Sequence, residues 1–211
     1  MLNVLSWIPQ GIKLNVNTDN LEYSNFVYMC IKNINQSEYY IPDNIKPFIE
    51  QMIDNIHKLS PHMYDNDHRY YCYLTLKKMY VQPNTFGNRE GWHIDGFLGG
   101  DQVNFIWSDS LPTEVAIGKF NISEDHHKSL FEIEEQVQVF TNLESNTLYM
   151  LDQTCVHRPA INSTDKTLLR TFVKITFTTE LFNGFGNAWN YKLPYIKPSK
   201  CRDIERNHGV I

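Results

Sequence analysis

Two histidines and one aspartate are the residues of this 211-residue chain best suited to chemistry. His93 and Asp95 are separated by one residue in the segment Gly-Trp-His-Ile-Asp-Gly. On an extended segment, residues i and i+2 project from the same face, so both side chains can reach one point. His157, in Cys-Val-His-Arg-Pro, can complete the set if the fold brings the two segments together. Two imidazoles and one carboxylate on one face of a metal leave the opposite coordination positions open, which is typical of non-haem iron(II) sites.

The order of elements around these residues is more specific than the His-x-Asp triplet, which arises readily by chance. The triplet follows a predicted strand and a turn, and further predicted strands separate it from His157. A cation, Arg170, then lies near the start of the last predicted strand. This ordered combination of strands, ligands and cation is much rarer than the triplet, so it supports a metal site.

The elements that must position these side chains are predicted to be mainly strands. Aromatic and β-branched residues fill 70–81, which ends at a turn rich in Pro, Asn and Gly. Further strands are expected at 103–107, 115–120, 131–140, 147–151 and 168–178. The strand at 131–140 is predicted from the alternation of apolar residues with Glu and Gln.

One helix is predicted before the strands, over residues 44–59. Its apolar residues recur at three- and four-residue steps, which gives it one apolar face to pack against a sheet. Asp43 is the expected N-cap, and Pro47 is tolerated in the first turn. Short strands that follow a helix indicate a mainly β fold with flanking helices, of the sandwich or jelly-roll kind.

Composition narrows the class of protein. Hydrophobic residues make up 42% and charged residues 20%, so the chain can bury a core. The net charge of −5 argues against a general polyanion binder, although the residues from 181 onward carry five basic against two acidic side chains. No apolar run is long enough to cross a membrane, no secretory signal is recognised, and the cysteines are far apart. We therefore expect a cytoplasmic protein with a single domain over 1–180 and a basic tail, 181–211, that wraps the surface.

On these residues the chain resembles the Fe(II)- and 2-oxoglutarate-dependent dioxygenase superfamily, whose fold is a double-stranded β-helix, or jelly roll. The matching stretch, about 70–179, is roughly half of the sequence, and the Trp-His-x-Asp form is similar to that of the phytanoyl-CoA hydroxylase branch. The resemblance implies that His93, Asp95 and His157 bind iron and that the protein uses Fe(II), 2-oxoglutarate and O2. It implies hydroxylation or oxidative demethylation of a substrate, with release of succinate and CO2, because related halogenases lack the carboxylate ligand.

The resemblance also implies a cation that binds the distal carboxylate of 2-oxoglutarate. Arg170, 13 residues after His157, suits this role because a planar guanidinium donates two parallel hydrogen bonds. Lys174 lies four residues further on the same strand face and is an alternative. Lys119, on a predicted middle strand, is another, because some members of the superfamily anchor the co-substrate from there.

Other residues near the proposed ligands have simpler interpretations. Asp152 either orients His157 through a hydrogen bond or caps a loop. Cys155 is expected to be a small buried residue, and the pair His126-His127 is interpreted as part of a solvated loop. Four aromatic residues are expected in the core, although they could line a pocket: Trp92, Phe97, Trp107 and Tyr149.

Two other classes of function remain open from the sequence. A cupin-like metalloprotein would use the same ligands without 2-oxoglutarate, and a non-catalytic jelly roll would serve as a binding or structural module. The substrate is not specified, since a small molecule, a peptide or a nucleobase all suit the superfamily. The basic tail could touch nucleic acid, but the acidic body disfavours that partner, and no membrane partner is expected.

Overall fold

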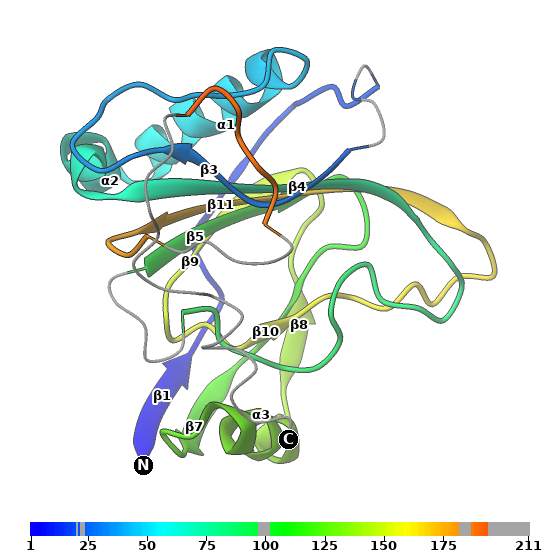
Figure 1. The fold of residues 1–211 in the computed structure, drawn as a ribbon. Helices are drawn as coiled ribbons and strands as arrows, with labels where there is room; N and C mark the ends of the chain where they lie inside the picture. The colour runs from blue at the N-terminus through cyan, green and yellow to red at the C-terminus, as the bar shows by residue number, and fades with distance from the viewer. Residues whose placement is uncertain (20, 22–23, 97–101, 182–186, 194–211) are drawn as a thin grey trace.

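The computed structural model describes residues 1–19, 21, 24–96, 102–181 and 187–193 (Figure 1). Its helices are α1 (Lys46–Leu59), α2 (Pro61–Asn66), the 3-10 helix η1 (Asp67–Arg69) and α3 (His126–Gln136). Its strands are β1 (Leu2–Ser6), β2 (Gly11–Lys13), β3 (Asn25–Lys32), β4 (Tyr71–Val81), β5 (Gln102–Ser108), β6 (Glu114–Ala116), β7 (Gly118–Ile122), β8 (Phe140–Asn142), β9 (Thr147–Leu151), β10 (His157–Arg158) and β11 (Leu168–Thr178).

Two antiparallel sheets face each other. The large sheet has the strand order β2-β9-β5-β11-β4-β3, and the small sheet has the order β10-β6-β8. From β4 onward the chain passes repeatedly between the sheets, since β5, β9 and β11 belong to the large one and β6, β8 and β10 to the small one. This alternation is the topology of a jelly roll, so the predicted mainly β fold is confirmed. The strands that alternate in this way lie between Tyr71, where β4 begins, and Thr178, where β11 ends.

Helix α1 covers the outer face of the large sheet, as Figure 1 shows. Its buried face has the predicted periodicity and consists of Phe48, Ile49, Met52, Ile53 and Ile56. The helix prediction is therefore confirmed over 46–59. The N-cap prediction is wrong, because the cap residue is Ile45 and the Asp43 carboxylate accepts a hydrogen bond from Lys192 Nζ at 2.6 Å.

Strand β11 presents apolar side chains to helix α1 on one face and a different set of side chains to the small sheet on the other. Val173, Ile175 and Phe177 pack into the same apolar cluster as the helix α1 residues. The alternate residues Arg170, Phe172 and Lys174 line a cavity between the two sheets. Because side chains alternate along a strand, every second residue of β11 points toward the small sheet.

The strand predicted at 131–140 is wrong, because residues 126–136 form helix α3. The Asp125 carboxylate caps this helix by accepting hydrogen bonds from the backbone N–H groups of His127 and Lys128, at 2.9 and 3.0 Å. Ile133 packs into the cluster that contains Trp92, whereas Phe131 is 73% exposed. The pair His126-His127 therefore begins a helix, and its interpretation as part of a loop is wrong.

Part of the chain after β11 lies along strand β3. Ala188 N–H donates to Val27 O at 2.7 Å, and Asn190 Nδ2 donates to Cys30 O and Tyr40 O at 2.9 and 2.7 Å. The expectations for Phe97 and for most of the basic tail, 182–186 and 194–211, fall on residues outside those described. None of the helices in the described part is long and apolar enough to span a membrane.

Candidate metal centre

The side chains of His93, Asp95 and His157 meet between the two sheets. Their ligand atoms all lie within 4.8 Å of one another, and Nε2 of His157 is 3.5 Å from Oδ2 of Asp95. The two imidazole rings have centroids 4.5 Å apart. Asp95 and His157 are 8% and 6% exposed, so two of the three groups are withdrawn from solvent. The structure thus brings together the three residues selected from the sequence.

An isolated antiparallel bridge places the two histidines opposite each other. The backbone N–H of His93 donates to His157 O at 3.0 Å, and that of His157 donates to His93 O at 2.9 Å. Directly opposed residues in an antiparallel pair project to the same side. Gly91 and Gly96, on either side of the His-x-Asp triplet, have φ angles of 90° and 72°, which favour glycine. These two turns flank the short segment that carries His93, and this segment pairs with β10 at the edge of the small sheet.

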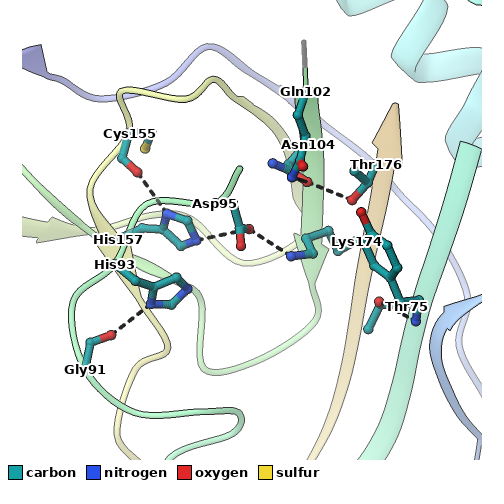
Figure 2. A network of polar contacts seen from close by, with 11 residues as sticks. Thr75, Gly91, His93, Asp95, Gln102, Asn104, Cys155, His157, Lys174 and Thr176 are labelled. Atoms are coloured by element: carbon teal, nitrogen blue, oxygen red, sulfur yellow. Dashed lines mark hydrogen bonds and ion pairs between the residues drawn. The ribbon is translucent and has the colours of Figure 1, made fainter. Parts of the chain in front are cut away.

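Each imidazole is held by the backbone carbonyl two residues before it. His93 Nδ1 lies 2.9 Å from Gly91 O, and His157 Nδ1 lies 3.0 Å from Cys155 O (Figure 2). A carbonyl oxygen only accepts, so Nδ1 carries the proton in both rings and Nε2 is the atom available to a metal. Such anchoring fixes both the tautomer and the ring orientation of a metal-binding histidine.

Asp152 caps a loop, which is one of the two roles that the sequence left open for it. Its Oδ1 accepts hydrogen bonds from the backbone N–H and the hydroxyl of Thr154, at 2.8 and 2.7 Å. The carbonyl of Cys155 anchors the ring of His157, and Cys155 itself is buried as expected.

Charge at the centre keeps Asp95 ionised. Burial alone would raise its pKa, but the ammonium of Lys174, 2.8 Å from Oδ2, and the imidazole of His157 hold the pKa well below its usual value. Burial, followed by the nearby His157, lowers the pKa of His93 to about 3, so this ring is neutral. Burial opposes protonation of His157, but its hydrogen bond with Asp95 raises the pKa above the usual value. A metal that binds Nε2 must therefore displace a proton from His157.

Two of the three candidate cations lie at the centre. A cavity of about 40 Å³, which has room for an ion and a few water-sized ligands, is lined by Asn88, His93, Asp95, Ile106, Thr113, His157, Pro159, Arg170, Phe172 and Lys174. Lys119 is exposed on β7, which pairs with β1 in a separate two-stranded sheet. The structure therefore brings Arg170 and Lys174, but not Lys119, to the proposed ligands.

Arg170 is 1% exposed and is held by backbone carbonyls. Its Nε donates to Ser110 O and Leu111 O at 3.2 and 3.1 Å, and its Nη1 donates to Gly87 O at 3.3 Å. The guanidinium also lies 4.7 Å from the ring centroid of Phe172. These contacts fix the guanidinium and do not use Nη2.

A second arginine, Arg158, connects the strands of the small sheet on the face opposite the centre. Arg158, next to His157, donates from Nε to Glu114 Oε2 at 2.6 Å. Its guanidinium lies 4.4 Å from the ring centroid of Trp92 and 5.2 Å from that of Phe140. We call this group the Arg158 cluster. The sequence analysis missed it, although Trp92 and Arg158 each adjoin a proposed ligand and so must point to the opposite face. Trp92, Trp107 and Tyr149 are buried, as expected.

Comparisons with known proteins give distant likenesses of structure. No family model matches the sequence, and no curated protein matches it. The fold is similar to AviO1 from Streptomyces viridochromogenes Tue57, with 16% identity, a TM-score of 0.44, and 77% of this chain and 75% of that chain covered. It is also similar to SnoN, a non-heme alpha ketoglutarate dependent epimerase from nogalamycin biosynthesis, with 13% identity, a TM-score of 0.41, and 66% and 59% covered.

A third similar structure is the nickel complex of the non-heme monooxygenase ThoJ, with 14% identity, a TM-score of 0.37, and 76% of this chain and 68% of that chain covered. The chain spans 26% of the length of EvdMO1 and 64% of EvdO2 from Micromonospora carbonacea var. aurantiaca.

Proposed function

We propose that this chain is an Fe(II)- and 2-oxoglutarate-dependent oxygenase that hydroxylates or oxidatively demethylates a substrate and releases succinate and CO2. The observation that carries the proposal is the convergence of two carbonyl-anchored imidazoles and one buried carboxylate in a cavity between the sheets. Such a ligand set binds a metal by one face and leaves positions for a bidentate 2-oxo acid and for O2.

The donor atoms fit iron(II). Metal–ligand bonds of about 2.0–2.2 Å place neighbouring ligand atoms about 3 Å apart. Nε2 of His157 and Oδ2 of Asp95 are already 3.5 Å apart, and all ligand atoms lie within 4.8 Å, so small side-chain movements can close the set around one ion. A bound iron would supply the oxidative decarboxylation of 2-oxoglutarate and the activation of O2.

In this proposal the residues of the cavity have three separate roles. His93, Asp95 and His157 hold the ion. Lys174, already paired with Asp95, keeps that carboxylate ionised and oriented. Arg170 binds the distal carboxylate of 2-oxoglutarate, because it lines the same cavity and its Nη2 is not used by the carbonyls that hold it.

The proposal extends to the whole chain. We assign residues 1–180 to one catalytic domain and 181–211 to a tail. We also propose a cytoplasmic location, which is supported by the free thiols of Cys30, Cys72 and Cys155, since a reducing compartment preserves both thiols and iron(II). A small molecule, a peptide or a nucleobase could be the substrate.

Succinate release tests the proposal. The purified protein is incubated with Fe(II), ascorbate and 2-oxoglutarate, alone and with panels of small molecules, peptides and nucleobases. We expect slow succinate formation without substrate and faster formation with members of one panel. His157→Ala, which removes one ligand, should give only the background. Succinate formation in the wild type that never exceeds this background would contradict the proposal.

A further inference from the structure

The inner face of the large sheet continues past Lys174 as a wall of uncharged polar side chains. Thr176 follows Lys174 by two residues on β11, and it pairs with Asn104 of β5 on one side and with Tyr73 of β4 on the other. All three are buried, at 0%, 0% and 1% exposure. Figure 2 shows Asn104 and Thr176 beside Lys174, on the side of the sheet that faces the metal centre.

Asn104 holds a buried donor that lacks a partner. Its Oδ1 accepts hydrogen bonds from Thr176 Oγ1 at 2.7 Å and from Gln102 Nε2 at 3.2 Å. Its Nδ2 has no hydrogen-bond partner within the part of the chain that the structure describes, and solvent does not reach it. A buried donor left without a partner costs about 1–3 kcal/mol. Such a group in a folded protein calls for an explanation, such as a ligand or an ordered water.

A strained tyrosine forms one end of the same wall. Tyr28 lies where the register of β3 shifts, and its φ of 49° is unusual for a bulky residue. Its N–H donates to Thr75 Oγ1 at 3.0 Å, and its ring stacks on Tyr73 with centroids 4.4 Å apart and an interplanar angle of 12°. Strain of this kind costs about 1–3 kcal/mol and clusters at functional sites.

We infer that this wall recognises the primary substrate of the proposed oxygenase, through Asn104 Nδ2, and that the substrate is an uncharged molecule with a carbonyl, ether or hydroxyl oxygen. The wall consists of Tyr28, Tyr73, Thr75, Gln102, Asn104 and Thr176, none of which is charged. The inference rests on the proposed function. If the co-substrate binds at Arg170, the primary substrate must reach the metal centre from the other side of Lys174, where Thr176 lies.

The order of side chains along β11 separates the two ligands. Arg170 lies four residues before Lys174 on the same face, and Thr176 lies two residues after it. At about 3.3 Å per residue, Thr176 is roughly 7 Å along the strand from the residue that contacts Asp95. A co-substrate held at Arg170 and a substrate held at Asn104 therefore approach the centre from opposite directions.

A ligand screen tests the inference on protein loaded with Zn(II), a redox-inert substitute for iron, and 2-oxoglutarate. The probes are a small-molecule library balanced between neutral oxygen acceptors, carboxylates and amines, and binding is read by saturation-transfer NMR. We expect hits among the neutral acceptors, and Asn104→Leu, which has nearly the same shape, should weaken them at least tenfold. Thr176→Val, which removes the hydrogen bond that orients the amide, should weaken them less. Asn142→Leu, at an exposed position of β8, serves as the control.

Calorimetric titration of Zn(II) and 2-oxoglutarate separates this inference from the proposed function. Asn104→Leu should change both affinities by less than twofold. A wild-type protein that binds neither ligand would overturn the proposed function and this inference with it. Loss of 2-oxoglutarate binding in Asn104→Leu would assign the amide to the co-substrate and overturn only the inference. Hits limited to charged probes, hits indifferent to Asn104→Leu, or an absence of hits would also overturn it.

Discussion

Lys174 and Arg170 lie on one face of β11 but contact different partners. Lys174 Nζ is 2.8 Å from the carboxylate of Asp95, whereas Arg170 donates to three backbone carbonyls beside the cavity. Lysine presents a compact charge that suits one carboxylate oxygen, and arginine presents a planar fork that suits a whole carboxylate.

Arg170→Lys should weaken 2-oxoglutarate binding at least tenfold, because the ammonium keeps the charge but loses the planar pair of donors. Isothermal titration of the metal-loaded protein measures this. Metal affinity should change less than twofold, and Lys119→Met, at an exposed lysine on β7, should leave both affinities unchanged. If Lys119→Met, and not Arg170→Lys, reduced 2-oxoglutarate binding, the assignment of Arg170 would be wrong. Unchanged binding in both variants would leave Lys174, which lines the same cavity, as the anchor. A wild-type protein that binds the metal but not 2-oxoglutarate would favour a metalloprotein that does not use it.

Lys174→Met should destabilise the metal-free protein by up to about 3–5 kcal/mol, because it removes the nearer of the two cations that pair with the buried Asp95 carboxylate and leaves only His157. Urea unfolding with and without Mn(II) tests this prediction. A bound ion replaces the lost positive charge, so saturating Mn(II) should recover much of the lost stability. An equal loss with and without Mn(II) would show that Lys174 acts on packing and not on the charge of Asp95.

The Arg158 cluster connects the segments of the small sheet that carry the two candidate histidine ligands. Arg158 on β10 contacts Glu114 on β6, Phe140 on β8 and Trp92, which is next to His93. One side chain therefore connects the segments that carry both histidines, from the face opposite the metal centre. We expect the cluster to fix the separation of His93 and His157.

Arg158→Leu should weaken Co(II) binding by about 10- to 100-fold, the range typical of residues that orient metal ligands. The visible absorption spectrum of bound Co(II) should change as well, which a general loss of stability would not cause. Lys13→Met, which removes an exposed lysine 3.6 Å from Glu144, should alter neither. A Co(II) spectrum and affinity that remain those of the wild type would mean that Arg158 supports only the fold.

Local patterns predicted helix α1 and strands β4, β5, β9 and β11, but not β1, β2, β3 or α3. The single strand expected at 115–120 is wrong, because β6 and β7 are separate strands that belong to different sheets. Ile133 and Val137 fit both a strand, as alternating apolar residues, and a helix, at a four-residue step. Three features favour the helix: Glu and Gln fill several of its other positions, Asp125 caps its first turn, and Ile133 packs in a cluster with residues of β1 and β7. Only the last of these needed the tertiary structure, so the cap at Asp125 was the signal that the sequence analysis missed.

The candidate ligands could be selected from the sequence because the His-x-Asp spacing needs only an extended backbone to place both side chains on one face. The contact of Lys174 with Asp95 could not be predicted from the sequence, because it depends on how the small sheet lies over the large one. The same is true of the Arg158 cluster, which requires the register of β10 with β6 and of β6 with β8.

In the whole molecule, the candidate metal ligands lie on one sheet and the two candidate cations of the cavity lie on the other. His93, Asp95 and His157 belong to the small sheet and its edge, whereas Arg170 and Lys174 belong to β11 of the large sheet. A metal and a 2-oxo acid bound together would therefore connect the two sheets. We expect binding of the pair to stabilise the whole jelly roll.

Mn(II) and 2-oxoglutarate together, each at 100 times its dissociation constant, should stabilise the fold by at least about 2.7 kcal/mol. For a chain of this size, that raises the melting temperature by about 5–10 °C. Differential scanning calorimetry tests the prediction. Glutarate, which lacks the 2-oxo group that chelates the metal, should add little to the effect of Mn(II) alone. A binding or structural module without a metal site would show no shift with either ligand.

Equilibrium binding of Co(II) to the metal-free protein tests the central claim most directly. The side chains of His93, Asp95 and His157 predict one tightly bound ion per chain, and Asp95→Asn and His157→Leu should each abolish stoichiometric binding while the fold is retained by circular dichroism. Wild-type protein that binds no stoichiometric ion, or variants that bind Co(II) as tightly as the wild type, would contradict the account.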